Sequence, residues 1–400
     1  MLELADIFRA AGPAYARAHA GQLLPSHRRA MAEIVACRTP ALGGSLYQCD
    51  ACAALDYRYH SCRNRHCPKC QDDRAQQWLA RVQTRLLPCD HYLLTFTLPS
   101  ALRTVARSHQ RLVYGALLQE AARAVQTLAA DRQWVGGTPG IIAVLHTWSR
   151  TVEYHPHAHL LVTAGGLAAD GATWMKPAHP RFFLPGYALS AIFRAKLRDA
   201  VRRMGLYPDI DPRVWTRAWT VHVQQIGTGE HAARYLSRYI YRVALTNQCL
   251  ERFADGRVTF RYTHARTHET RRATVPVDTF IGRFLQHVLP RGFTKIRSYG
   301  LLSPSRRLDL ARTRSVLDVH ARASPRPHGR PTPAQAPTSP GTVAAAELGD
   351  RDPPAIVAIP VTSAPATRAP ATRAVSRCPA CHRGYLRCVE RYHPSRAPPS

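Results

Sequence analysis

The stretch HPHAHLLVTAGG, residues 155–166, guides the interpretation of the fold, because it places three histidines at the start of an apolar segment. Alternate residues of a β-strand point to the same side of a sheet. His157 and His159 therefore project together, while the apolar residues between and after them face the core. Two imidazoles on one face can bind a divalent metal ion if a neighbouring element supplies a third ligand. The pattern predicts a metal site at the start of a buried strand.

Three residues are candidates for the third metal ligand. His146 lies on the preceding predicted strand and can reach across a hairpin, so we prefer it. Glu153 in the connecting turn and Gln225 at the end of a later strand remain alternatives. Two ordinary buried or surface histidines are the plainer interpretation of the pair. A metallo-β-lactamase-type site is excluded, because Leu160 and Leu161 stand where its H-x-H-x-D-H motif needs other residues.

Hydrophobic periodicity on either side of this stretch predicts both strands and helices. Strands are expected at 91–99, 140–148, 157–166 and 216–226, with a hairpin at 257–264 and 271–277. Helices are expected within 1–36 and 74–87, and at 100–131, 188–204, 229–245 and 279–290. The prediction is an α+β fold with an antiparallel sheet.

Six of the 11 cysteines fall within residues 37–70. Cys49 and Cys52 form one C-x2-C pair, and Cys67 and Cys70 form a second. Two such pairs on facing turns make a closed tetrahedral zinc site, so we expect these four thiolates to share one structural Zn²⁺. Two cysteines, Cys37 and Cys62, are left over. They can form a second metal site with His27, His60 or His66 as further ligands, or they can be plain buried thiols.

The net charge favours a nucleic-acid partner. The chain carries 55 Lys and Arg against 26 Asp and Glu, a formal charge of +29, and guanidinium groups bind phosphate oxygens in pairs. A GC-rich genome that encodes surface charge as arginine would explain part of this excess. An apolar run long enough to cross a membrane is absent from the sequence, and the first 25 residues lack the pattern of a signal peptide. We expect a cytoplasmic, nucleoid-associated bacterial protein.

The predicted helix 229–245 carries tyrosines and arginines at helical spacing. Tyr235 and Tyr239 stand one turn apart on one face. A second stripe at the same spacing is formed by Arg234, Arg238 and Arg242. A phenol beside a row of guanidinium groups suits attack on a DNA phosphate. A core stripe of tyrosines beside a solvated arginine face is the alternative.

Together these motifs resemble the HUH single-strand endonucleases, whose signature is His-hydrophobe-His followed by a helix with Tyr-x-x-x-Tyr. The order of the motifs resembles the two-tyrosine rolling-circle insertion-sequence transposases. The matching segments, spread over roughly residues 20–305, are YQCDAC…SCRNRHCPKCQ, HYLLTFTLP, LHTWSRTVEYHPHAHLLVTAGGL, RYLSRYIYRVAL and FLQHVLPRGFTKIRSYG.

The resemblance implies a ferredoxin-like antiparallel core preceded by a small zinc-ribbon module. It implies catalytic Mg²⁺ or Mn²⁺ at His157 and His159, nucleophiles Tyr235 and Tyr239, and structural Zn²⁺. The expected partners are single-stranded DNA, transposon ends and target DNA, joined through a 5′-phosphotyrosine. A plasmid rolling-circle replication initiator and a non-catalytic zinc-ribbon DNA-binding protein are the alternative functions.

Three regions are expected along the chain. Residues 1–88 are interpreted as a helical and zinc-binding module, 89–310 as the nuclease domain, and 311–400 as a disordered basic tail. The tail is rich in proline and contains a PATRAPATRA repeat, a composition that cannot bury enough apolar surface to fold. Its end, CPACHRGYLRC (378–388), is a candidate for a small cysteine knuckle.

Overall fold

The computed structural model describes residues 1–179, 182–228, 245–264, 267, 269–323 and 376–394, without the side chains of 72–76 and 319–323. The described residues belong to two compact units. The first draws on 1–73, 243–288 and 352–400, and the second on 74–242 and 289–351. Each unit is therefore assembled from separate stretches of the chain.

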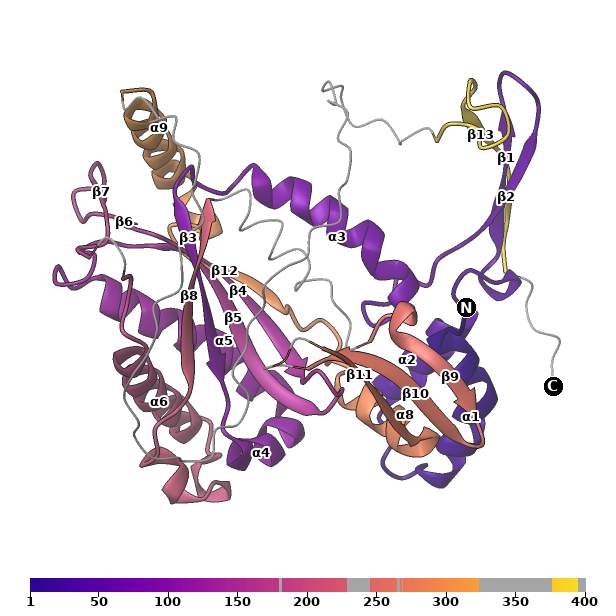
Figure 1. The fold of residues 1–400 in the computed structure, drawn as a ribbon, viewed down its shortest axis with the longest axis horizontal. Coiled ribbons are helices and arrows are strands. Elements are labelled where there is room, and N and C mark those ends of the chain that lie inside the picture. Colours follow the sequence, from indigo (N-terminus) through magenta and orange to yellow (C-terminus); the bar gives the residue numbers. More distant parts are fainter. Residues whose placement is uncertain (180–181, 229–244, 265–266, 268, 324–375, 395–400) are drawn as a thin grey trace. The chain divides into compact units, whose positions relative to one another are not determined.

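A five-stranded sheet forms the centre of the second unit (Figure 1). Its strands lie in the order β12-β4-β5-β3-β8, and every neighbouring pair is antiparallel. The strand that carries the paired histidines, β5, is the middle one. The bounds are β3 (Asp90–Thr97), β4 (Gly140–Trp148), β5 (Tyr154–Thr163), β8 (Val221–Thr228) and β12 (Ile296–Gly300). The predicted mixed α+β fold with an antiparallel sheet is confirmed.

One face of this sheet packs against helices and forms the main core. Leu94, Phe96 and Leu160 are fully buried there together with apolar residues of the helices. Burying a side chain of this size contributes roughly 1.5–3 kcal/mol, so this face holds the strands in register. The covering helices are α4 (Arg103–Ser108), α5 (Gln110–Ala129) and α6 (Gly186–Arg203).

The other face is covered at one end by a smaller cluster. Trp78, Val82 and Leu86, on and just after α3 (Pro68–Gln83), pack on Val144 and Leu161. His146 and His159 lie further along this same face, since residues two apart on a strand share a side. Helix α9 (Arg307–Ala323) and the short strands β6 (Gly166–Leu167) and β7 (Trp174–Met175) complete the second unit.

The first unit joins the N-terminal helices to a hairpin region from the middle of the chain. Phe8 meets Phe284 edge to face, with the ring centroids 5.3 Å apart, and Phe260 and Phe280 are buried beside them. This packing ties together α1 (Leu4–Ala18), α2 (Pro25–Ala36), β9 (Leu250–Ala254), β10 (Arg257–Thr263), β11 (Thr270–Pro276) and α8 (Val277–Gln286).

A second sheet of this unit unites the two ends of the sequence. Strands β1 (Gly44–Cys49) and β2 (Leu55–Tyr59) form a hairpin, and β13 (Leu386–Tyr392) pairs antiparallel with β1. In Figure 1 the yellow β13 lies along the indigo β1. Residues 376–394 are therefore structured, and they contain the segment 378–388 that the sequence offered as a small cysteine knuckle within an otherwise disordered tail.

The structure places two boundaries differently from the sequence prediction. Residues 250–286 pack with the N-terminal helices rather than with the five-stranded sheet, because the apolar face of α8 is buried against α1. Helix α9 continues past residue 310 to Ala323, and its Thr313 is buried. Of the helices in the described ranges, none has the length and apolar character needed to cross a membrane.

Candidate functional site

Three histidines converge on one face of the central sheet. His157 on β5 pairs directly with His146 on β4, and His159 follows two positions further along β5. One ring nitrogen from each lies within 4.8 Å of the others, and all three side chains are buried. The Nε2 atoms of His157 and His159 are 3.1 Å apart. The strand register therefore gathers three imidazoles at one point.

Neighbouring groups orient two of these rings. The Nδ1–H of His157 donates to the His155 carbonyl oxygen at 2.7 Å, so the lone pair of a neutral His157 is on Nε2. The His159 Nδ1 contacts the Thr95 hydroxyl at 3.0 Å. If that hydroxyl accepts the Nδ1–H, both Nε2 lone pairs face one point, which is the arrangement that binds a cation.

Burial keeps His159 in the neutral state. Loss of hydration lowers the pKa of His159 well below its ordinary value, and the neighbouring His157 lowers it further. A neutral imidazole is the form that binds a metal ion. Its deprotonated nitrogen is thus available at neutral pH.

The other candidates for the third ligand occupy different positions. Gln225 pairs with Tyr92, whose side chain belongs to the helix-covered core, so Gln225 is on the opposite face from the histidines. Glu153 is exposed in the turn between β4 and β5 and is not a member of the three-histidine group. His146 alone of the three candidates is brought to the pair.

Sequence reasoning missed the residues that surround the histidines. Thr95 on β3 pairs with His159 on one side and with His222 of β8 on the other, so all three share a face. Arg103 of α4 donates to the His155 Nδ1 at 2.6 Å. Alternation within HYLLTFTLP could have identified Thr95, because it falls on the side opposite Leu94 and Phe96.

The cysteines form two four-membered groups, both within the first unit. The first group combines Cys37, Cys62, Cys67 and Cys70, with sulfur atoms within 4.8 Å of one another. The Sγ atoms of Cys37 and Cys62 lie 3.5 and 3.6 Å from that of Cys70. The candidate ligands His27, His60 and His66 are not part of this group.

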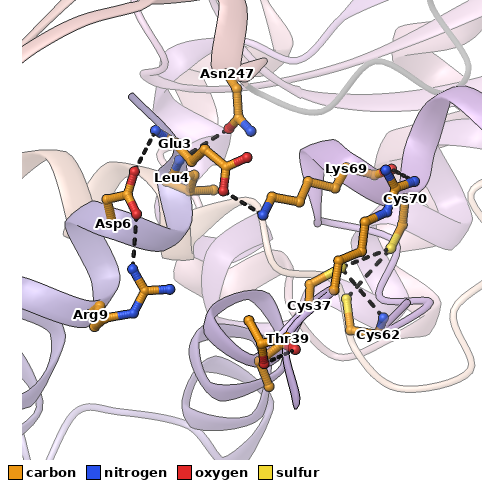
Figure 2. A network of polar contacts seen from close by, with 12 residues as sticks. Glu3, Leu4, Asp6, Arg9, Cys37, Thr39, Cys62, Lys69, Cys70 and Asn247 are labelled. Carbon is orange, nitrogen blue, oxygen red and sulfur yellow. Dashed lines mark hydrogen bonds and ion pairs between the residues drawn. The ribbon is translucent and has the colours of Figure 1, made fainter. Parts of the chain in front are cut away.

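Figure 2 shows three members of the first group, Cys37, Cys62 and Cys70, beside a chain of polar contacts. Lys69, next to Cys70, forms an ion pair with Glu3 at the start of α1. Hydrogen bonds from Cys37, Cys62 and Cys67 lower the pKa of Cys70. A bundle of thiols with at least one stable thiolate is suited to a structural metal ion.

The second group combines Cys49 and Cys52 with Cys378 and Cys381. The expectation that Cys49 and Cys52 share one ion with Cys67 and Cys70 was therefore wrong. Cys49 ends β1 at the tip of the β1–β2 hairpin, whereas Cys62 and Cys67 follow its base. Five strand residues span about 15 Å, too far for thiolates that must meet at one ion.

The tyrosines and arginines predicted for DNA cleavage lie outside the described residues. These are Tyr235, Tyr239, Arg234, Arg238 and Arg242. Their proposed roles therefore continue to rest on the sequence.

Two family models match the chain. The model described as "Putative transposase" matches residues 140–309, which include all three clustered histidines. The model described as "Transposase zinc-binding domain", of the IS91 type, matches residues 7–98. Two separately defined transposase regions thus follow one another in this sequence.

Named relatives agree with both matches. The chain is 34% identical over 418 residues to "Putative transposase y4qJ" of Sinorhizobium fredii, covering 99% of this chain and 97% of that protein. It is 28% identical over 288 residues to "Transposase for insertion sequence element IS801" of Pseudomonas savastanoi pv. phaseolicola, covering 68% and 69%. No solved structure gives a significant match.

Proposed function

The chain belongs to the IS91-type transposases, and from this premise we propose that it nicks and rejoins single-stranded DNA through a 5′-phosphotyrosine intermediate. The observation that carries this proposal is the convergence of His146, His157 and His159 on one face of the sheet. A histidine that only stabilises the core needs hydrogen-bond partners for its own ring nitrogens. Here three buried rings each direct a nitrogen toward one common point, which makes them a donor set for a cation.

The architecture around the histidines supports an HUH-type core. They lie on the middle strand of a five-stranded antiparallel sheet and on its neighbour, with helices packed on the opposite face. We propose that this sheet is the ferredoxin-like core of the nuclease. The apolar face then fixes the strands, while the histidine face binds the DNA phosphate.

The donor set fits a divalent transition-metal ion. Three imidazole nitrogens favour Mn²⁺ over Mg²⁺, because Mg²⁺ prefers oxygen ligands. We propose that His146, His157 and His159 hold the ion and that Thr95 orients His159. A bound cation would supply Lewis-acid polarisation of the scissile phosphate.

Tyr235 is the proposed nucleophile, on the strength of the sequence motif. Its phenolic oxygen forms a bond to phosphorus as the bond from phosphorus to the 3′ oxygen breaks, and the departing oxygen takes up a proton. The products are a 5′-phosphotyrosine and a free 3′-OH, and energy for rejoining is retained in the phosphotyrosine. Tyr239 would attack a second phosphate, with Arg234, Arg238 and Arg242 binding the DNA backbone.

We propose transposon ends and target DNA as the substrates, and the bacterial nucleoid as the place of action. The formal charge of +29 agrees with a polyanionic partner. The first cysteine group lies wholly inside the region matched by the zinc-binding family model, and we propose that it binds one structural Zn²⁺.

A labelled single strand carrying the flanking DNA of the gene tests this function. Wild-type protein with Mn²⁺ should give a covalent protein–DNA adduct and a free 3′-OH. The Tyr235→Phe variant should lose the adduct while binding DNA with nearly unchanged affinity. His157→Ala should lower the nicking rate at least 100-fold, since removing one ligand weakens the metal site.

A substitution on the same strand provides the matched control. Leu161→Val trims a buried apolar residue of β5 that packs in the cluster under α3 and is not a member of the histidine group, and it should keep nicking within a few-fold of wild type. Nicking that survives in both Tyr235→Phe and Tyr239→Phe would disprove tyrosine chemistry. Strong DNA binding with no cleavage under any metal would instead favour a non-catalytic zinc-ribbon protein, and cleavage at a plasmid origin alone would favour a replication initiator.

A further inference from the structure

The second cysteine group joins segments from opposite ends of the chain. Cys49 and Cys52 lie at the tip of the β1–β2 hairpin, and Cys378 and Cys381 immediately precede β13. The zinc-binding family model ends at residue 98 and so contains only the first two of these residues. We propose that these four cysteines hold a second structural zinc ion, which fastens residues 376–394 to the N-terminal module.

The sulfur geometry fits a tetrahedral ion. The Sγ atoms of Cys49 and Cys381 are 3.7 Å apart, and those of Cys52 and Cys378 are 3.8 Å apart. A zinc–sulfur bond of about 2.3 Å places the corners of a tetrahedron about 3.8 Å apart. A disulfide needs about 2.05 Å between sulfur atoms, and all four thiols are free.

The two cysteine pairs have the same backbone conformation. The N–H of Ala51 donates to the Cys49 sulfur at 3.4 Å, and the N–H of Ala380 donates to the Cys378 sulfur at 3.4 Å. The residue after each second cysteine, Ala53 or His382, has a positive φ of 57° or 56°. Backbone donors of this kind stabilise a thiolate. Each pair is thus a preformed knuckle, and two knuckles make a closed zinc site.

Contacts outside the sulfur atoms show that the two knuckles fit each other. The carboxylate of Asp50 accepts the Tyr385 N–H at 2.7 Å, and the Asp50 N–H donates to the Tyr385 carbonyl at 3.1 Å. A Cβ at Gly384 would lie 2.5 Å from the Cys49 sulfur, a distance that real Cβ atoms do not show. Glycine at this position permits the close approach of the second knuckle.

The apolar support for this arrangement is small. Its buried cluster contains only Cys49, Cys378 and Leu386 among the described residues, and most of β13 is exposed. A bound zinc ion supplies folding free energy where a core is too small to do so. The C-terminal segment therefore depends on metal for its attachment. Without that segment, Cys49 and Cys52 supply only two of the four thiolates that a closed zinc site needs.

Zinc content of the full-length protein, purified under reducing conditions, tests the stoichiometry. Wild type should contain two zinc ions per chain by elemental analysis. The double variant Cys378→Ser/Cys381→Ser should contain one. Cys388→Ser is the matched control, because Cys388 lies on β13 outside both groups, and it should retain two. Equal zinc content in wild type and the double variant would overturn the proposal, whereas one zinc in wild type and none in the double variant would show that the first group is the empty one.

A glycine pair gives a test that leaves every cysteine in place. Gly384→Ala should lower the affinity for the second zinc at least tenfold, measured by competition with a chromogenic chelator. Gly21→Ala is the control, because its new Cβ would meet nothing within 4 Å. Equal zinc affinity in the two variants would contradict the close fit of the knuckles.

Cleavage of the connection measures the attachment itself, even if a variant folds poorly. A site-specific protease sequence is inserted between Gly341 and Asp350 of an otherwise native chain, and the protein is cut after purification. The C-terminal fragment should remain bound during gel filtration with zinc and should separate after EDTA treatment. A fragment that separates in the presence of zinc would refute the clamp, and one that stays bound until a reductant is added would identify disulfides instead.

Discussion

The histidine group and the cysteine groups are built in opposite ways. The histidines lie between positions 146 and 159, on two neighbouring strands of a sheet with a large apolar core. The second cysteine group joins positions 49 and 381, and within the described part of the chain its buried cluster has three residues. In one region the fold places the ligands before any metal arrives; in the other the metal helps to make the fold. Imidazole nitrogens held by a rigid sheet therefore suit the proposed catalytic ion, whereas four thiolates around a small cluster suit the proposed structural zinc.

Metal removal should separate the two regions most strongly. A chelator strong enough to remove zinc should abolish amide protection in β1, β2 and β13, because a structural zinc site contributes on the order of 10 kcal/mol to folding. Strands β4 and β5 should keep their amide protection, since the apolar core on their helix-covered side contains none of the proposed metal-binding histidines. Hydrogen–deuterium exchange followed strand by strand measures both. An equal loss of amide protection in the two units would show that the five-stranded sheet also depends on metal.

Acid should weaken the second unit through a histidine that the proposed chemistry does not use. Burial lowers the pKa of His91 to about 4, while an unfolded histidine titrates near 6.5. The unfolded chain then binds a proton that the folded chain does not, so stability is complete above about pH 6.5 and falls as the pH decreases toward 4. Between pH 7 and pH 5 the loss from this residue should be about 2 kcal/mol.

Urea unfolding at the two pH values tests this expectation. His91→Gln should show a smaller loss of unfolding free energy between pH 7 and pH 5 than wild type. His179→Gln, at an exposed position of the same unit, should retain the full wild-type loss. An unchanged pH dependence in His91→Gln would assign the acid sensitivity to other groups.

The smallest expected effect concerns the preformed character of the histidine site. Thr95→Val removes the hydroxyl that contacts His159 at 3.0 Å, so the ring is held less firmly. Loss of such a supporting contact costs roughly 10-fold to 100-fold in metal affinity. Isothermal titration with Mn²⁺ measures it. Thr127→Val, at an exposed position of α5 on the opposite side of the sheet, is the control and should bind Mn²⁺ as wild type does.

Sequence periodicity predicted much of the second unit. The expected strands at 91–99 and 140–148 correspond to β3 and β4, and the expected helix 188–204 corresponds to α6. Strand β12 was missed as a strand, because IRSYG has no clear alternation and its burial depends on the neighbouring β4. Periodicity along the sequence predicts individual strands and helices. It does not predict which strand pairs with which, or which helix packs on which face of the sheet.

The sequence by itself determined the paired projection of His157 and His159, because alternation along a strand is a property of the backbone. It likewise determined the C-x2-C spacing, which is local. Only the tertiary structure decided that His146 joins the histidine pair, through the register of β4 against β5. Only the tertiary structure decided which cysteine pairs combine. That choice depends on the β1–β2 hairpin, which keeps Cys49 away from Cys67, and on a strand more than 300 residues further along the chain. Contacts at such separation leave no periodic trace in the sequence, since they are set by the packing of whole elements.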